Sequence, residues 1–190
     1  TLLGLPLGVM LYVTRPRQIL AMPVLNQVLG IITNIGRSIP FIILMVAIIP
    51  FTRMLVGTSI GINAASVPLT IAAIPFVARL IEGALNEISP GLIESAQSMG
   101  ATPWQIITKV LIPEARGGII TGLTITLVTL VSYSAMAGAV GGGGLGDLGI
   151  RYGYNRFNPT IMLITVVILV VLVQGFQSLG DYLVRKSDRK

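Results

Sequence analysis

The side chains of this chain that could do chemistry are few, and their types exclude most catalytic sites. The 190 residues include no histidine and no cysteine, and the seven acidic residues are scattered. Histidine is the commonest general base and metal ligand, so its absence removes the usual centre of such a site. The sequence contains no lysine-bearing phosphate loop, no Ser–His–Asp set and no carboxylate pair at catalytic spacing. We therefore expect no catalytic residue, no metal site and no enzyme activity.

One stretch formally fits a nucleotide-binding pattern, the glycine-rich run 141–146, which reads Gly-x-Gly-x-x-Gly. That fingerprint binds a dinucleotide only after a strand, before a helix and with an acidic residue about twenty residues further on. The run instead ends an apolar stretch and leads into a polar loop, so we do not expect nucleotide binding. A flexible or re-entrant turn beside a pore is the better interpretation.

Four side chains near one end of an apolar stretch could line a path for a small amphipathic solute: Ser132, Tyr133, Ser134 and Met136. Hydroxyl groups, an aromatic ring and a thioether would suit such a solute. The same residues could instead form hydrogen bonds between helices and fill space, as these residue types often do in membrane bundles. The sequence leaves both interpretations open.

Arg79 and Glu82 lie three residues apart in an apolar segment, so they share one face of a helix. Charges at membrane depth usually face the bundle interior or water and suggest a function. Both residues lie near the expected inner interface, however, where long side chains reach the headgroups at little cost. We favour a structural role for the pair.

The elements that must position these residues are membrane helices. The chain is 53% hydrophobic and 11% charged, whereas charged residues make up about 25% of a soluble domain. The net charge of +6 is spread between apolar blocks, which marks loops at a membrane surface and not a nucleic-acid-binding face. We expect an all-α, polytopic transmembrane bundle that forms one domain over residues 1–190.

Five membrane spans are predicted, each needing about 20 apolar residues. The first is truncated, because residues 1–13 are apolar but too few to span alone. Residues 19–35 are expected to form an interfacial or packed helix, with the alternative that part of this segment belongs to the second span. The other spans are expected at 39–56, at 64–85, within 117–146, and from 159 onward.

The placement of the cations predicts the orientation, since cytoplasmic loops carry an excess of lysine and arginine. With five spans, ten cations fall on one side and three on the other, which makes the first side cytoplasmic. The N-terminus is then outside and the C-terminus inside. The ten are Arg15, Arg17, Arg37, Arg79, Lys109, Arg116, Arg185, Lys186, Arg189 and Lys190, and the three are Arg53, Arg151 and Arg156.

A polar stretch between the third and fourth spans, residues 87–116, is here called the elbow and is expected to be cytoplasmic. Ser89 is placed to cap a first helix, and Gly100 suits the left-handed residue that ends it. Thr102 opens a Thr-x-x-Gln capping box at a second helix, which Pro113 is expected to end. The sequence thus predicts two short helices joined at a glycine.

No acidic residue lies in the middle of an expected span. Secondary transporters often carry buried acids that bind the coupling proton or sodium ion. Together with the lack of an ATP-binding loop, this favours a transporter whose energy comes from a separate subunit. An ion-coupled secondary transporter and a membrane scaffold without transport are the alternatives.

The elbow resembles the cytoplasmic loop of ABC-importer permeases, whose pattern is Glu-Ala-Ala, three residues, Gly, nine residues, then Ile-x-Leu-Pro. The spacing is kept here, with conservative departures at Ser95, Val110 and Ile112. In that family the loop is a coupling helix that docks on an ATP-binding subunit. The resemblance implies this role for Glu94, Ser95, Ala96, Met99, Gly100 and Ala101.

The stretches around 38–61, 67–85 and 133–158 are similar to methionine-importer permeases, the MetI-like family. The resemblance implies a permease subunit in the bacterial inner (plasma) membrane that translocates an amino acid, methionine, by alternating access. Its implied partners are a second copy of the permease, two cytoplasmic ATP-binding subunits and an external substrate-binding lipoprotein. The permease itself is expected to hold no cofactor, because the partner binds ATP. A different small amino acid or metabolite is the alternative substrate.

Overall fold

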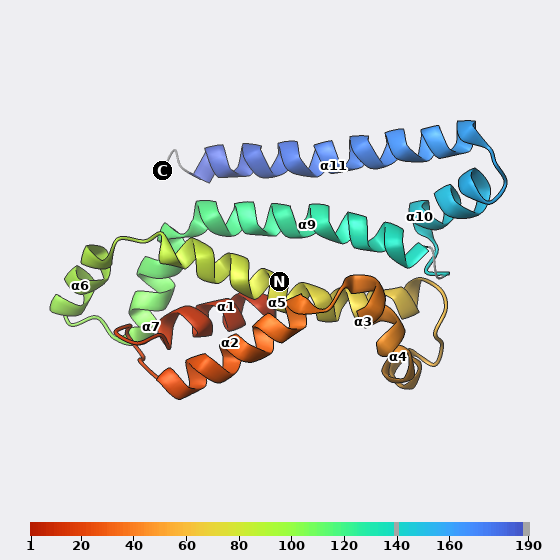
Figure 1. The fold of residues 1–190 in the computed structure, drawn as a ribbon. Helices are drawn as coiled ribbons and strands as arrows, with labels where there is room; N and C mark the ends of the chain where they lie inside the picture. The colour runs from red at the N-terminus through yellow and green to blue at the C-terminus, as the bar shows by residue number, and fades with distance from the viewer. Residues whose placement is uncertain (139–140, 188–190) are drawn as a thin grey trace. The chain divides into compact units, whose positions relative to one another are not determined.

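The computed structural model describes residues 1–138 and 141–187, and every regular element in these two ranges is a helix (Figure 1). Two of the elements, η1 and η2, are π-helical. In chain order they are α1 (Gly4–Val13), α2 (Pro23–Ser38), α3 (Phe41–Ala47), α4 (Ile49–Val56), α5 (Ile62–Asn86), α6 (Pro90–Ser98), α7 (Pro103–Ile106), η1 (Ile107–Leu111), α8 (Ile112–Glu114), α9 (Arg116–Gly138), α10 (Gly144–Leu148), η2 (Gly149–Tyr154) and α11 (Pro159–Ser187).

Three of the described helices are long and apolar enough to cross a membrane: α5, α9 and α11. Helices α2 and α3 pass the same test as a pair, although the chain bends by 98° between them. Counting that pair as one broken span gives four. The all-helical membrane fold is therefore confirmed, and the count of five spans stays a prediction because α1 has only ten residues.

The chain divides into two compact units, which we describe separately. Unit 1 contains Thr1–Arg37, Ile74–Thr124 and the chain from Gly180, and unit 2 contains Ser38–Ala73 and Ile125–Leu179. The long helices α5, α9 and α11 each contribute residues to both units. A single membrane domain over residues 1–190 stays a prediction.

Glycine lets the helices of unit 1 approach closely. Gly4 and Gly8 of α1 lie against Val77 and Ile81 of α5, so that a Cβ built on Gly8 would lie 2.7 Å from the Ile81 Cβ. Real carbon atoms do not approach so closely, and a larger residue here would push the two helices apart. Small residues at such spacing are the usual means of packing helices in membranes.

Helix α9 packs on α5 in the same way. Gly118 and Gly122 of α9 lie against Ala84 and Leu80 of α5, and a Cβ built on Gly118 would lie 2.7 Å from the Ala84 Cβ. Helix α5 thus contacts two pairs of glycines, one on α1 and one on α9, and the members of each pair are four residues apart. This spacing places both members of a pair on one helix face.

The core of unit 1 joins α1 and α5 to the elbow. Its buried residues are Val9, Tyr12, Val13, Val77, Ile81, Ala84, Leu85, Ile88, Ile93, Ala96, Ile106, Ile107, Leu111, Ala115 and Ile119. Because both elbow helices contribute to it, the elbow is packed against the membrane helices of unit 1 and does not hang from flexible loops.

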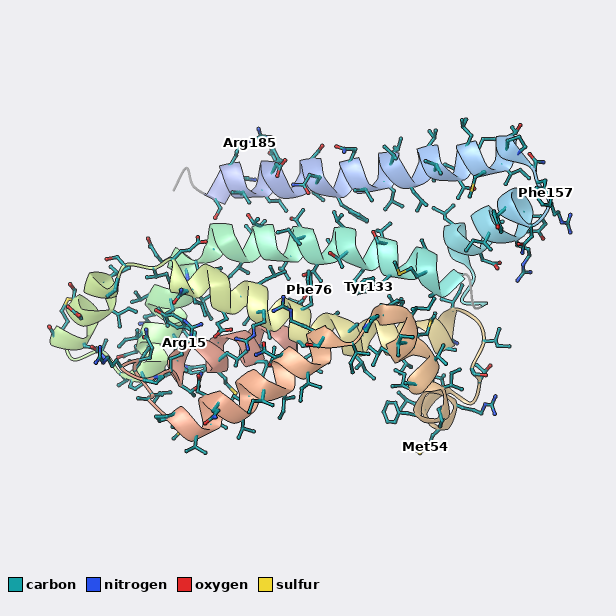
Figure 2. The ribbon with its side chains drawn as sticks, viewed as in Figure 1. Arg15, Met54, Phe76, Tyr133, Phe157 and Arg185 are labelled. Atoms are coloured by element: carbon teal, nitrogen blue, oxygen red, sulfur yellow. The ribbon has the colours of Figure 1, made fainter. Side chains whose placement is uncertain are left out.

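Unit 2 has a much smaller buried core, formed by Phe41, Met45 and Ala137 with partly buried neighbours that include Tyr133. The rings of Phe41 and Tyr133 stack with centroids 4.5 Å apart and planes 3° from parallel. Figure 2 shows Tyr133 on the side of α9 that faces α3. This stack joins α3 to α9.

Candidate functional site

The first elbow helix begins and ends as the sequence predicts. Ser89 is its N-cap residue and Pro90 follows at the first position, but the Ser89 side chain makes no capping hydrogen bond. At the other end Gly100 has a φ of +78°. Its N–H donates to the Gln97 carbonyl (2.9 Å), and the Ala101 N–H donates to the Ala96 carbonyl (3.1 Å). These two bonds form a Schellman motif, which requires the left-handed residue.

The second elbow helix opens with the predicted capping box. The Gln105 N–H donates to the Thr102 hydroxyl oxygen (3.4 Å), and the Thr102 N–H donates to the Gln105 side-chain oxygen (2.8 Å). Each side chain therefore satisfies a backbone donor that the helix leaves free. Only three residues, Met99, Gly100 and Ala101, separate this box from the end of α6, so the angle between the elbow helices is fixed locally.

The prediction that Pro113 ends this helix is wrong. The chain passes from α7 through η1 into α8, which contains Pro113 near its start and runs to Glu114. The Ile112 N–H donates to the Ile107 carbonyl, five residues back, in a π turn. Proline normally breaks a helix because it lacks an N–H and crowds the carbonyl four residues earlier. A π turn directly before it widens the backbone and accommodates the ring.

The elbow buries one face and exposes apolar side chains on the other. Ala96 is only 4% exposed, whereas Met99 is 81% exposed and Trp104 is 73% exposed. Glu94 and Ser95 are also exposed, and the Ser95 hydroxyl donates to the Gly91 carbonyl of its own helix. The six predicted coupling residues therefore differ in environment: Ala96 faces the core of unit 1, Ala101 is half-buried against it, and the other four are exposed.

The charged pair of the third predicted span belongs to a larger buried network. Glu82 is 4% exposed and forms ion pairs with Arg15 (2.7 Å) and Arg79 (2.6 Å). Arg15 follows α1, far from α5 in the sequence, and this partner could not be found from spacing alone. Removing Glu82 would leave two partly exposed guanidinium groups without their shared counter-ion.

The four predicted path residues do not all line one cavity. Ser132 and Met136 line an open pocket of about 530 Å³ between α9 and α11, which Gln174 also lines. Tyr133 points instead toward Phe41 in the core of unit 2. Ser134 is exposed and does not line that pocket. The residues that face one another across the pocket come from two helices, which the local pattern of one helix does not reveal.

A second, smaller pocket in unit 2 was missed by sequence reasoning. It encloses about 110 Å³ and lies among α3, α4, the start of α5 and the glycine-rich run. Its lining consists mostly of small or apolar residues: Met45, Val46, Ile49, Thr52, Ser59, Gly61, Ala64, Ala65, Pro68, Ala137 and Gly142. The glycine-rich run forms a turn here, since the Gly142 N–H donates to the Ala137 carbonyl (2.9 Å). Gly141, Gly142 and Gly143 thus form a turn, and the last three residues of the run begin helix α10.

The polar loop before α11 carries exposed aromatic and charged side chains. Arg151 pairs with Asp147 (3.1 Å), and the Arg156 guanidinium lies 4.8 Å from the centre of the Tyr152 ring. Phe157 is 90% exposed and lies at the turn between η2 and α11 (Figure 2). Among the described residues no group of three or more potential ligands could hold a metal ion.

Comparison with known proteins gives a consistent result. The family described as "Binding-protein-dependent transport system inner membrane component" matches residues 4–189. A Vibrio cholerae protein, the "Probable D-methionine transport system permease protein MetI", is 64% identical over 188 residues, which cover 99% of this chain and 84% of that protein. The Escherichia coli protein "D-methionine transport system permease protein MetI" is 62% identical over 136 residues, covering 72% and 63%.

Solved structures agree with these relatives. A chain of the inward-facing MetNI methionine ABC transporter superposes with a TM-score of 0.96 at 58% identity, over 98% of this chain and 86% of that one. An amino acid ABC transporter crystallised with histidines has a TM-score of 0.75 at 21% identity, which is a likeness of fold alone. The family match and the 64% identity show that this chain belongs to the inner membrane components of binding-protein-dependent transport systems.

Proposed function

We propose that the chain is the permease subunit of an ATP-driven importer of methionine, in which separate subunits hydrolyse ATP. The observation that carries this proposal is the 64% identity, over nearly the whole chain, to a permease named for D-methionine transport. The match to the MetNI transporter supports an assembly of two permease copies with ATP-binding subunits and an external substrate-binding protein. The permease itself then needs no cofactor, since ATP binds to its partner.

We propose that Glu94, Ser95, Ala96, Met99, Gly100 and Ala101 form the contact that couples this permease to the ATP-binding subunit. The exposed Met99 side chain, together with Trp104, would fill an apolar groove on that subunit, and Glu94 would meet a polar rim. Ala96 contributes differently: its small side chain lets α6 lie close against the core of unit 1. The Schellman turn at Gly100 fixes the direction of the contact.

The proposed movement follows from the shared core. When two ATP-binding subunits close on ATP, the elbows docked on them are displaced. Because Ile93 and Leu111 of the elbow pack in the same core as Val13 and Ile81, a displaced elbow carries α1 and α5 with it. The pathway would then open alternately to each side of the membrane. We further propose that Ser132, Tyr133, Ser134 and Met136 belong to that path, with Ser132 and Met136 at the pocket beside α11.

The proposed orientation places the elbow and the C-terminus in the cytoplasm and the N-terminus outside. The excess of cations on the elbow side supports it. Because the chain has no cysteine, single cysteines can test it directly. Ser98→Cys in the elbow should react with a membrane-impermeant maleimide only after the cells are permeabilised. Ser59→Cys, in the loop before α5, should react in intact cells, and the reverse pattern would overturn this orientation.

The transport proposal is tested by uptake of labelled methionine into vesicles that hold the reconstituted complex with its binding protein. We expect ATP-dependent accumulation, no ATP hydrolysis by the permease alone, and loss of uptake in Gly100→Pro and Glu94→Lys complexes that still assemble. Competition with other amino acids defines the substrate. Uptake that survives ATP depletion and collapses with the proton gradient would contradict the proposal, as would normal uptake by both variants.

A further inference from the structure

We infer that Glu82 is a positioning residue for coupling: its carboxylate ties α1 and α2 to the part of α5 that leads into the elbow. The inference rests on the proposed function, because it gives Glu82 a part in transmitting the movement of the elbow. Helix α5 ends one turn after Glu82, and the elbow follows directly. A tie at this point connects the elbow to α1 and α2, which precede it in the chain.

Both oxygens of the Glu82 carboxylate are engaged. Oε1 accepts hydrogen bonds from Arg15 Nε (3.1 Å) and Nη2 (2.7 Å), which is a two-pronged contact with one guanidinium. Oε2 accepts from Arg79 Nη1 (2.6 Å). Charge-assisted bonds of this length, and forked contacts from arginine in particular, fix geometry as well as supplying energy. The carboxylate therefore holds two guanidinium groups in defined positions.

Each arginine extends the tie to a further element. Arg15 Nη1 donates to the Asn86 side-chain oxygen (2.8 Å) at the end of α5, so the loop after α1 is held at two points on that helix. Arg79 Nη2 donates to the Gly30 carbonyl (3.1 Å) and to the Asn34 side-chain oxygen (2.8 Å), both on α2. Three helices thus meet around a single buried carboxylate.

The attachment of α2 depends on polar contacts more than on packing. Only Thr33 of this helix is buried, and no α2 residue belongs to the core of unit 1. Besides the Arg79 bonds, α2 is held by Asn26, whose side-chain nitrogen donates to the Leu11 carbonyl (2.6 Å) and to the Thr14 hydroxyl (3.1 Å). The elbow, α1 and α5 share an apolar core, so they would stay folded without Glu82. Without Glu82, Arg79 would no longer be held in the position from which it bonds to α2.

The charge balance explains why the acid is central. Two guanidinium groups face one carboxylate, and Arg79 Nε is buried without a hydrogen-bond partner among the described residues. If Glu82 loses its charge, both arginines lose their counter-ion together and repel each other. The expected result is a complex that still docks and hydrolyses ATP while α2 no longer follows the elbow.

The test uses the complete reconstituted transporter with Glu82→Gln, which keeps the size of the side chain and removes its charge. ATP hydrolysis and uptake are measured in the same vesicles, and the ratio of solute moved to ATP hydrolysed is the readout. We expect hydrolysis to stay within about twofold of wild type and uptake to fall by roughly tenfold or more. Glu82→Asp should recover part of the uptake. Asp181→Asn, which removes an exposed acid of α11 outside the elbow, should leave the ratio unchanged.

A second variant keeps the test decisive if Glu82→Gln does not assemble. Arg15→Gln leaves the Glu82–Arg79 pair intact and cuts only the tie to α1, so we expect uptake to fall by about fivefold with hydrolysis retained. The inference is overturned if uptake and hydrolysis fall in parallel with the amount of assembled complex, which indicates a purely structural role. It is also overturned if the ratio does not change. Failure of the wild-type complex to import would instead overturn the proposed function.

The movement itself can be measured because the chain has no native cysteine to interfere with labelling. Spin labels at Gln27→Cys on α2 and Lys109→Cys in the elbow report the distance between these two parts of unit 1. We expect one narrow distance distribution that persists with and without ATP in wild type, and a broadened one in Glu82→Gln. Equal breadth in both proteins would contradict the proposed tie.

Discussion

Unit 1 and unit 2 are built from the same long helices but differ in the size of their buried cores. In unit 1 the close approach of α1 and α9 to α5, a fifteen-residue buried core and the Glu82 network leave little freedom. In unit 2 three residues form the buried core, and two pockets open among the helices. The elbow lies in the first unit and the candidate path residues lie in the second.

This difference has a physical reason that fits the proposed division of labour. A segment that transmits the movement of the elbow to other helices must not deform itself. Close-packed helices deform little and therefore transmit strain well. A segment that lets a solute pass must rearrange, and sparse packing makes its alternative arrangements similar in free energy. Each of the following predictions compares two positions. One position is closely packed or makes a defined contact in the structure, and the other is not packed or lacks that contact.

The largest effect is expected at Gly8. A side chain there meets the Ala78 carbonyl oxygen 2.6 Å from its Cβ, so Gly8→Leu must separate α1 from α5. We expect a loss of about 3 kcal/mol of stability, at the upper end for overpacked sites. Gly175→Ala in unit 2 meets nothing within 4 Å and should gain up to about 1 kcal/mol from helix propensity. Thermal unfolding in detergent measures both changes in stability. Equal changes in the two variants would contradict the difference in packing between these two positions.

The aromatic stack of unit 2 should have the next largest effect. Tyr133→Leu removes the ring that stacks on Phe41 and should destabilise the chain by about 1–2 kcal/mol. Tyr133→Phe keeps the ring and should leave thermal stability within about 0.5 kcal/mol of wild type. If Tyr133→Phe keeps stability but loses methionine uptake, the hydroxyl group serves the path and not the core.

The two helix starts of the elbow provide a matched pair. Thr102 makes its capping hydrogen bonds and Ser89 does not. Thr102→Ala should therefore lower the unfolding free energy by about 1 kcal/mol, and Ser89→Ala by less than about 0.5 kcal/mol. Thermal unfolding of the two variants in the same detergent provides the comparison. If Ser89→Ala lowered the unfolding free energy more than Thr102→Ala, the capping hydrogen bonds would not be what stabilises the starts of the elbow helices.

The smallest effects on stability are expected along the candidate path. Ser132→Ala and Ser134→Ala each remove one exposed hydroxyl group and should change stability by less than about 0.5 kcal/mol. Only Ser132 lines the pocket beside α11, so Ser132→Ala should raise the KM for uptake by about threefold to tenfold, the worth of one hydrogen bond. An equal change in Ser134→Ala would exclude that pocket as the site of contact.

Much of the elbow could be predicted because its signals are local. The φ of Gly100 and the bonds between Thr102 and Gln105 depend on residues within a few positions of one another. The error at Pro113 shows the limit of such rules. Proline disfavours an ordinary α-helix because it lacks an N–H and its ring crowds the preceding turn. A π turn before Pro113 makes room for the ring, and no residue type in this stretch predicts that turn.

The candidate path was harder to predict because its residues belong to different surfaces. Ser132, Tyr133 and Met136 are neighbours in the sequence, yet Tyr133 packs into the core and the other two line a pocket. Helical geometry alone separates such positions by about 100° per residue. Which face meets a partner helix depends on the packing of that partner.

The sequence by itself determined the class of the molecule, both ends of the first elbow helix and the start of the second, because composition and short-range hydrogen bonding decide these. The tertiary structure decided which charges meet. Arg15 and Glu82 are 67 positions apart, and nothing in either segment indicates the other. They meet only because Gly4 and Gly8 let α1 pack directly on α5. The network that we assign to coupling is therefore a product of close helix packing.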